Sequence, residues 1–201
     1  SVLRQLIAHI GDDAFVAGVG EYLRSHAFGN GELAEFIVAI EGADGRSLTA
    51  WSAAWLQTAG ADRIGLEGDA LTRVAPEAHP ADRAHTLDVA AFVGGREVAR
   101  VELVVDGERT PVPGLADVPA GALIVPNASD LTWAEVALDA ATIDGLPGNL
   151  ADVPDASARS VLWVSLLGSV ARGEVDPRTV LSVFVAAWPR EDSGAVLSRV
   201  S

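Results

Sequence analysis

The chain of 201 residues contains no cysteine, no methionine and no lysine, and each absence excludes something. Without cysteine there is neither a disulfide nor a thiolate metal site, whereas the redox compartment stays open. All 14 basic residues are arginine, which together with abundant Ala, Val, Gly and Asp indicates a GC-rich bacterial gene. Because no methionine stands at position 1, we expect an internal part of a longer protein; a processed mature terminus is the alternative.

The chain is also short of positive charge and of long apolar runs. Its 28 acidic residues give a formal net charge of −14, and such a chain repels phosphate backbones. The longest apolar stretches, between Arg159 and Arg172 and between Arg178 and Arg190, are shorter than the roughly 20 residues that span a bilayer. No secretory signal pattern is visible. We therefore expect a globular chain with no nucleic-acid and no membrane partner.

Apolar residues recur at helical spacing over residues 1–59 and predict four helices. Gly11 ends the first, and Asp12 is the expected cap of the second. A glycine-rich turn at residues 28–31 precedes the third, and Ser47 is the expected cap of the fourth. One face of the second helix is expected to be apolar and to hold Phe15, Val19, Tyr22, Leu23 and His26.

Short runs rich in β-branched residues follow between Arg63 and Val125, separated by Gly, Pro and Asp clusters. The runs 85–92 and 97–105 are expected to form a hairpin with Gly94-Gly95 as its turn, and Asp106-Gly107 is the expected next hairpin turn. Short strands at this spacing predict a small antiparallel sandwich.

The helical period returns in the last third of the chain. Residues 133–138 are expected to be extended and to form a link. Residues 155–171 predict a helix that is apolar almost all round and that other helices must therefore cover. Asp176-Pro177 predicts the start of the next helix, which Pro189 ends. Successive helical hairpins of this kind are typical of a stacked helical array.

One set of residues has a distinctive order and spacing across the four N-terminal helices: Phe15, Gly18, Tyr22-Leu23, His26, Phe28-Gly29-Asn30, Leu33, Phe36, Ile40-Glu41, Gly45, Leu48, Trp51, Trp55-Leu56 and Gly60. It resembles the end of the catalytic domain in the aminopeptidase N family of zinc metallopeptidases. Further segments are similar to downstream parts of actinobacterial members: Asp82-Arg83-Ala84-His85, Val105-Asp106-Gly107-Glu108-Arg109, Val125-Pro126-Asn127, Asp130-Leu131-Thr132-Trp133 and Ala158-Arg159-Ser160-Val161-Leu162-Trp163.

The resemblance implies an α+β multidomain fragment. Members of the family have a thermolysin-like catalytic domain, then a small β-sandwich, then an α-helical superhelical domain. Accordingly, residues 1–60 are expected to be the helical C-terminal end of a catalytic domain, 61–130 an antiparallel β-sandwich, and 131–201 a linker with the first helices of the helical domain. The parent enzyme is expected to be cytoplasmic and to use zinc to hydrolyse N-terminal residues from peptides.

The family's catalytic residues have no counterpart in this sequence. Its zinc motif, His-Glu-x-x-His, places two histidines one helical turn apart on one face. No glutamate is bracketed in this way by His9, His26, His79 or His85. The amine-binding Gly-x-Met-Glu-Asn loop is excluded because there is no methionine. We therefore assign no catalytic, substrate-binding or metal-binding residue to the chain and expect the working residues upstream of Ser1.

Several single residues have a possible functional role, and in each case the structural role is favoured. His79 and His85 lack a third metal ligand and are expected in a loop and at a strand start, respectively. His26 is expected at a helix end, where the helix dipole favours it. Tyr22, the one tyrosine, falls within the apolar pattern of its helix rather than beside acid or base groups.

The same holds for residue pairs. Trp51 and Trp55, one helical turn apart, are more typical of core packing than of an aromatic binding platform. Two carboxylate pairs are expected to be solvated at helix ends: Glu41 with Asp44, and Glu191 with Asp192. Two glycine pairs do not follow strands and so are not phosphate loops: Gly18-x-Gly20 and Gly29-x-Gly31.

The sequence thus predicts a scaffold fragment of a zinc aminopeptidase that binds no zinc and is inactive by itself. Two other interpretations stay open: a noncatalytic protein-interaction module, and a degenerate relative whose zinc motif has decayed. Partial exposure of Trp163, Phe184 or Trp188 is expected to favour self-association.

Overall fold

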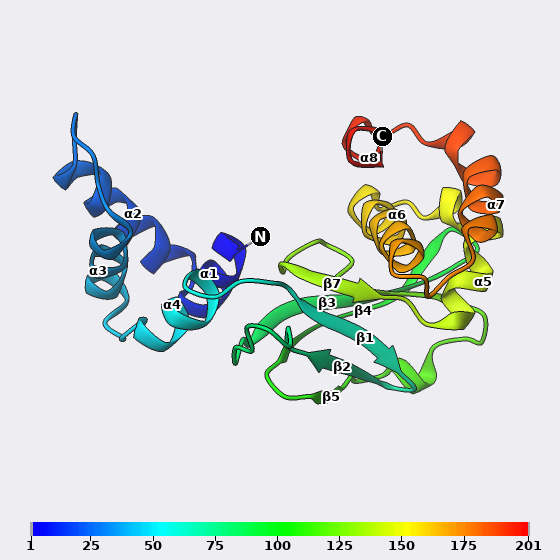
Figure 1. Ribbon diagram of the computed structural model, residues 1–201, viewed down its shortest axis with the longest axis horizontal. Coiled ribbons are helices and arrows are strands. Elements are labelled where there is room, and N and C mark those ends of the chain that lie inside the picture. The colour runs from blue at the N-terminus through cyan, green and yellow to red at the C-terminus, as the bar shows by residue number, and fades with distance from the viewer. Residues whose placement is uncertain (1, 201) are drawn as a thin grey trace. The chain divides into compact units, whose positions relative to one another are not determined.

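The computed structural model describes residues 2–200, with every side chain in this range except that of Arg199, and divides the chain into two compact units (Figure 1). The first unit comprises the residues up to Gly60 together with Pro76–Arg83, and the second comprises Ala61–Ala75 and the residues from Ala84 onwards. The described residues form eight α-helices and two sheets, which confirms the α+β class. The division into three domains at residues 60 and 130 stays a prediction.

The first unit contains four helices, as the sequence predicted: α1 (Val2–Ile10), α2 (Asp12–Ser25), α3 (Leu33–Asp44) and α4 (Thr49–Leu56). The helices α2 and α3 pack closely, because a Cβ atom added at Gly18 would lie only 2.9 Å from Ile40 Cα. The core of the unit is small and consists of Leu6, Ile10, Ile40 and Leu48, with Phe15, Phe36 and Trp51 among the residues packed around it.

Three local predictions for the first unit were wrong. Asp12 begins α2 instead of capping it, since Gly11 occupies the cap position with a φ of 89° and no side chain bonds there. Leu48 rather than Ser47 occupies the cap position of α4, although the Ser47 hydroxyl oxygen accepts from the Thr49 N–H at 3.3 Å. Leu23 is exposed rather than part of the apolar face of its helix.

The segment Pro76–Arg83 belongs to the first unit because a buried arginine attaches it there. Arg83 Nε donates to the Ala54 carbonyl at 2.9 Å, and its guanidinium lies over the Trp55 ring, 5.9 Å from the ring centroid. A cation over a tryptophan face is attracted by the ring quadrupole. The buried guanidinium is thus both hydrogen-bonded and stacked.

Seven strands form two sheets in the second unit. The first sheet has the strand order β5 (Arg109–Pro111), β2 (Ala70–Val74), β1 (Asp62–Glu67) and β7 (Ala134–Ala137). The second sheet has the strand order β4 (Arg96–Val105), β3 (His85–Val93) and β6 (Leu123–Pro126). The predicted hairpin turn is confirmed, with positive φ values of 53° at Gly94 and 76° at Gly95 between β3 and β4.

Strand β3 has a buried core on each of its faces, because successive side chains of a strand point in opposite directions. Leu87 and Val89 point to the core that contains Ile64 of β1 and Leu71 of β2. Ala90 and Phe92 contribute to a larger core shared with the helices that follow. This double burial joins sandwich and helices in one compact unit.

Two predictions for the sandwich need correction. It is not wholly antiparallel, since β7 pairs with β1 in parallel register, Asp62 opposite Ala134. Residues 133–138 are therefore no mere link: four of them form a strand of the first sheet. Asp106-Gly107 is not a hairpin turn, because the chain passes there from β4 in one sheet to β5, which pairs with β2 in the other.

The remaining α-helices lie over one side of the sandwich (Figure 1): α5 (Ala140–Asn149), α6 (Ala156–Ala171), α7 (Pro177–Ala187) and α8 (Gly194–Val200). The described residues also form three short 3-10 helices: η1 (Leu115–Asp117), η2 (Leu150–Asp152) and η3 (Trp188–Arg190). As predicted, Asp176 caps α7 by accepting from the Arg178 N–H at 2.8 Å. Within residues 2–200, none of the helices combines the length and apolarity needed to cross a bilayer.

Helix α6 is the central helix of this group. Trp163 is fully buried, so its expected exposure was wrong, while Phe184 on α7 is 40% exposed and Trp188 half-buried, as predicted. The three rings lie within 6.4 Å of one another, centroid to centroid. The helix that looked apolar all round is covered by β-strands as well as by helices, since Val125 and Val136 belong to the same core.

Candidate functional site

The described residues do not fit a zinc ion. His26 follows α2, His79 lies in the loop before β3, and His85 begins β3, as the sequence predicted. Residues 2–200 contain no group of three His, Cys, Asp or Glu side chains that could hold one metal ion. Because a protein zinc site needs at least three such ligands, no metal-dependent step can be assigned to these residues.

A hydroxyl, an imidazole and a carboxylate are aligned inside the second unit. Thr132 Oγ1 lies 2.7 Å from His85 Nδ1, and His85 Nε2 lies 3.0 Å from Asp62 Oδ2. Hydrolases use this sequence of groups to activate a nucleophile. Here Asp62 and His85 are fully buried and Thr132 is 2% exposed, so a substrate has no access to the hydroxyl.

This buried cluster is therefore structural. Arg73 Nη1 also donates to Asp62 Oδ2, at 2.9 Å, so the carboxylate is paired with a cation as a buried charge requires. Asp62, Arg73 and His85 come from β1, β2 and β3, and Thr132 precedes β7, so the cluster connects the two sheets. Sequence reasoning found only His85, because its partners stand tens of residues away with no periodic relation to it.

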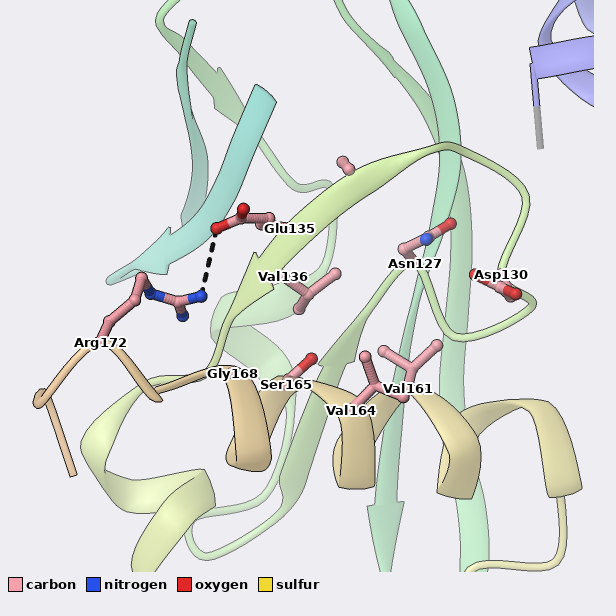
Figure 2. A pocket seen from close by; sticks show the side chains of 10 residues that line it. Asn127, Asp130, Glu135, Val136, Val161, Val164, Ser165, Gly168 and Arg172 are labelled. Carbon is pink, nitrogen blue, oxygen red and sulfur yellow. Dashed lines mark hydrogen bonds and ion pairs between the residues drawn. The ribbon is translucent and has the colours of Figure 1, made fainter. Parts of the chain in front are cut away.

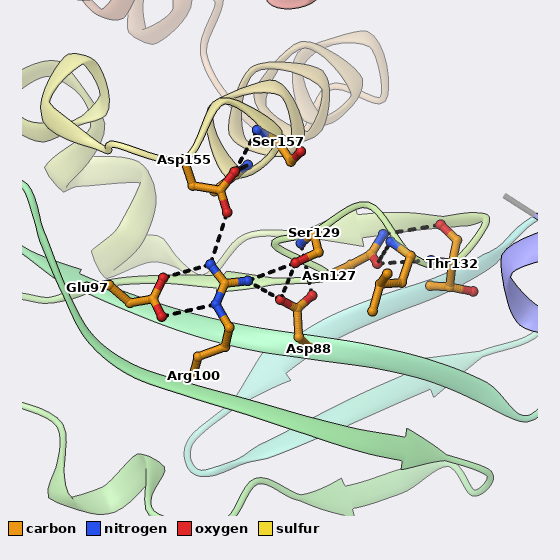
Figure 3. A network of polar contacts seen from close by, with 10 residues as sticks. Asp88, Glu97, Arg100, Asn127, Ser129, Thr132, Asp155 and Ser157 are labelled. Carbon is orange, nitrogen blue, oxygen red and sulfur yellow. Dashed lines mark hydrogen bonds and ion pairs between the residues drawn. The ribbon is translucent and has the colours of Figure 1, made fainter. Parts of the chain in front are cut away.

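A second polar network centres on Arg100 of β4 (Figure 3). Its guanidinium forms a two-pronged contact with Glu97, at 3.0 and 2.7 Å, and donates to Ser129 Oγ at 2.9 Å and to Asp155 Oδ2 at 3.0 Å. It also donates to Asp88 on β3. The hydrogen bonds to Glu97, with the charges of Asp88 and Glu97, raise the pKa of Arg100, which stays protonated. A permanently charged arginine is a clamp rather than an acid or base.

A third network lies at the other end of α6. Arg172 Nη1 donates to Glu135 Oε2 on β7 at 3.1 Å, and Arg172 Nε to Glu174 Oε1 at 3.2 Å. Arg63 on β1 binds the same Glu174 with two nearly parallel hydrogen bonds, at 2.5 and 2.7 Å. Hydrogen bonds from Arg63 and Arg172 lower the pKa of Glu174 to about 2. The carboxylate thus stays ionised and holds the end of α6 against the sheet.

The expected solvation of the carboxylate pairs was wrong for two residues. The Asp44 side chain is 6% exposed and pairs with Arg46 at 2.8 Å; that of Glu191 is 1% exposed and pairs with Arg159 at 2.9 Å. Asp192 is 90% exposed, as expected. An arginine therefore pairs with each buried carboxylate, and the hydrogen bond from Arg46 lowers the pKa of Asp44.

The aromatic and glycine motifs of the first unit serve packing. Trp51 and Trp55 stack at 6.1 Å between centroids, with Trp55 buried, so the core role is favoured over a binding platform. Tyr22 meets the Phe36 ring edge-on at 5.5 Å. A Cβ atom at Gly31 would lie 2.2 Å from the Tyr22 hydroxyl oxygen. The close approach of Tyr22 therefore explains why position 31 is a glycine, and no bound phosphate is needed to account for it.

One ionisable contact in the first unit is sensitive to pH. His26 Nδ1 lies 2.9 Å from the Tyr22 carbonyl oxygen, and its Nε2 lies 3.1 Å from Glu35 Oε2. The hydrogen bond to Tyr22 and then that to Glu35 raise the pKa of His26 above 6.5. Glu35 also accepts from the Glu32 N–H at 2.8 Å, which completes a capping box at the start of α3.

A cavity of about 230 Å³ lies between α6 and β7 (Figure 2). Ser165, from the middle of α6, points its hydroxyl across the cavity toward Val136 of β7. Asn127 holds the neighbouring loop in place, because its Oδ1 accepts from the N–H groups of Leu131 and Thr132. All residues that line the cavity belong to the second unit and come from α6, from β7 and from the segments next to them: Asn127, Asp130, Ala134, Glu135, Val136, Val161, Val164, Ser165, Gly168 and Arg172.

Comparison with known proteins confirms the resemblance found in the sequence. Over 98% of its length the chain is 34% identical to aminopeptidase N from Streptomyces lividans, of which it spans 26%. Its fold is similar to that of aminopeptidase A from Legionella pneumophila, solved in complex with aspartic acid. The TM-score is 0.64 at 15% identity, with 99% of this chain and 25% of that one covered. No protein-family model matches the sequence. The chain thus spans about a quarter of both proteins.

The raised pKa of His26 predicts a pH-dependent hairpin of α2 and α3. Its stabilising effect is complete below the unfolded-state value of 6.5 and is lost as the pH rises through the higher folded-state pKa. Hydrogen exchange of α2 and α3 amides is therefore expected to slow between about pH 8 and about pH 6, after correction for intrinsic rates.

In the variant Glu35→Gln, which keeps an acceptor oxygen for the capping box, the NMR titration of His26 is expected to move to lower pH. An unchanged titration, or the same shift in the control Glu102→Gln, contradicts this.

Proposed function

We propose that this chain is a scaffold segment of a zinc-dependent aminopeptidase related to aminopeptidase N, which removes N-terminal residues from peptides. The observation that carries the proposal is the identity of 34% over 98% of the chain. The zinc ligands, the general base and the amine-binding residues would belong to another part of the polypeptide, since residues 2–200 hold no group of three possible metal ligands. The cytoplasmic location of the parent enzyme stays a prediction.

The surface of the first unit supports a role as the wall of a larger domain. Phe28 is fully exposed at the turn between α2 and α3, with a φ of 63° that few residues other than glycine adopt. Large apolar side chains are also exposed along the two helices, at Val16, Leu23, Leu33 and Val38. Such apolar surface typically marks a contact. We propose that the catalytic part of the polypeptide packs on it.

The second unit would supply a spacer and a barrier in this proposal. Its sandwich is a compact body with a core of its own, and a second core attaches α5, α6 and α7 to it. The helices would begin the helical domain that limits access of substrates to the active site. Each role is structural, in keeping with the arginine partners of the buried carboxylates Asp62, Asp44 and Glu191.

The proposal predicts that the chain alone neither binds zinc tightly nor hydrolyses aminoacyl substrates. After metal removal and incubation with zinc, mass spectrometry and elemental analysis are expected to show less than one equivalent. Release of nitroaniline from alanine and leucine p-nitroanilides is expected to equal the buffer blank. One tightly bound zinc per chain, or hydrolysis that a metal chelator abolishes, would contradict the proposal.

An open reading frame that encodes His-Glu-x-x-His upstream of this segment separates the peptidase from an interaction module or a degenerate relative.

We also propose that the isolated chain self-associates through α7. The outward face of this helix carries Leu181, Phe184 and Val185, of which Leu181 and Val185 are more than 60% exposed. Val185→Glu is expected to reduce the weight-average mass measured by light scattering at high concentration, because burial of a charge opposes association. Val98→Glu, at a half-exposed position on β4, is the matched control and is expected to leave the mass unchanged. A strict monomer for the unmodified chain at every concentration would refute self-association.

A further inference from the structure

The cavity between α6 and β7 opens along the edge of a sheet. In the strand order β5-β2-β1-β7, β7 is hydrogen-bonded to a neighbour on one side only. Three consecutive residues of this strand line the cavity: Ala134, Glu135 and Val136. Because successive side chains point to opposite faces, a cavity that touches all three runs along the strand's edge rather than over one face. An edge strand presents backbone N–H and C=O groups that can pair with another chain.

The opposite wall of the cavity offers an apolar surface with one hydrogen-bonding group. Val161 and Val164 of α6 face Val136 across the space (Figure 2). Ser165 is 6% exposed, and its hydroxyl makes no hydrogen bond within the described part of the chain. The Ser165 hydroxyl oxygen is not among the fully buried side-chain atoms that lack a partner in residues 2–200, so it is not closed off and is available to a group that enters the cavity.

Ionic contacts attach both ends of α6 to the sandwich. At the start of the helix Arg100 binds Asp155 at 3.0 Å, and near its end Arg172 binds Glu135 at 3.1 Å. The first contact joins the start of the helix to β4, and the second joins its end to β7, on the wall of the cavity. Binding to a preformed site avoids the cost of ordering the protein.

We propose that this cavity binds an extended peptide segment, which adds to the free edge of β7 as a further strand. A small aliphatic side chain of the peptide lies among Val136, Val161 and Val164, and a peptide carbonyl accepts a hydrogen bond from Ser165. Strand addition of this kind takes its affinity from backbone hydrogen bonds and its specificity from a pocket for alternate side chains.

Size and charge define the ligand further. At about 230 Å³ the cavity is smaller than sites for whole drug-sized ligands, roughly 300–1,000 Å³, and suits one side chain with its flanking peptide groups. Within the lining, Arg172 pairs with Glu135 at 3.1 Å, so neither of these two charges selects the ligand. With a net charge of −14 on the chain, a basic peptide is favoured over an acidic one. The inference does not depend on the proposed aminopeptidase role, because the peptide is held and not cleaved.

The test uses the whole chain and the labelled peptide acetyl-Arg-Val-Ala-Val-Arg-amide, whose blocked ends exclude exopeptidase cleavage. We expect saturable binding by fluorescence anisotropy and at least a five-fold slower hydrogen exchange of the amides in β7. Val164→Trp, at a 39% exposed position in the lining, is expected to weaken binding at least ten-fold. The matched control Val98→Trp, at a 41% exposed position on β4, is expected to bind as the unmodified chain does.

The peptide itself supplies a second test that does not depend on how a variant folds. A version N-methylated at alternate residues cannot pair as a strand and is expected to bind at least ten-fold more weakly. Equal binding of the N-methylated peptide, equal binding of the glutamate version acetyl-Glu-Val-Ala-Val-Glu-amide, or no saturable binding at all would overturn the proposal. So would full competition by free valinamide at matched concentration, which would indicate a small-molecule site.

Discussion

The contacts of the Arg100 guanidinium connect the start of α6 to the sandwich of the second unit. This side chain reaches Asp88 on β3, Glu97 on β4, Ser129 in the following loop and Asp155 at the cap of α6. Arginine suits this position, since its planar group binds several oxygens at once and stays charged. Helix α6 in turn brings Trp163 and its neighbours into the core that α5, α7 and α8 share. Arg100 thus joins the start of α6 to the sandwich, and this shared core packs the rest of the helical group against it.

Buried ionisable groups of the described residues pair with one another. Where a carboxylate is buried, an arginine holds it ionised, as Arg159 does for Glu191. Where a hydroxyl, an imidazole and a carboxylate are aligned, at Thr132, His85 and Asp62, burial closes the site to substrates. Catalysis needs titratable groups in an accessible cleft with divergent pKa values. The proposed scaffold role rests on the similarity to about a quarter of an aminopeptidase N and on the lack, within residues 2–200, of a group of three possible metal ligands.

Sequence periodicity predicted the elements whose own residues determine them. The four N-terminal helices, the β3–β4 hairpin and the start of α7 at Asp176 follow from local signals. Helix α5 was missed because Gly145, Pro147 and Gly148 disfavour a helix, and burial of Leu146 outweighs that preference. Strand β7 looked like a link because its four residues need β1, some seventy positions earlier, to form a sheet. The cavity could not be predicted from the sequence for the same reason, because the residues of its two walls are far apart along the chain.

The coupling between Arg100 and Asp155 tests most directly whether this contact joins the helices to the sandwich. A double-mutant cycle of Arg100→Gln and Asp155→Asn in urea unfolding removes the charges, while asparagine keeps the helix cap. A coupling free energy of about 0.5–3 kcal/mol is expected for residues that share one network. If the effects of the two substitutions on the free energy of unfolding add to within about 0.3 kcal/mol, the two side chains act independently. That result would contradict a stabilising contact between Arg100 and Asp155.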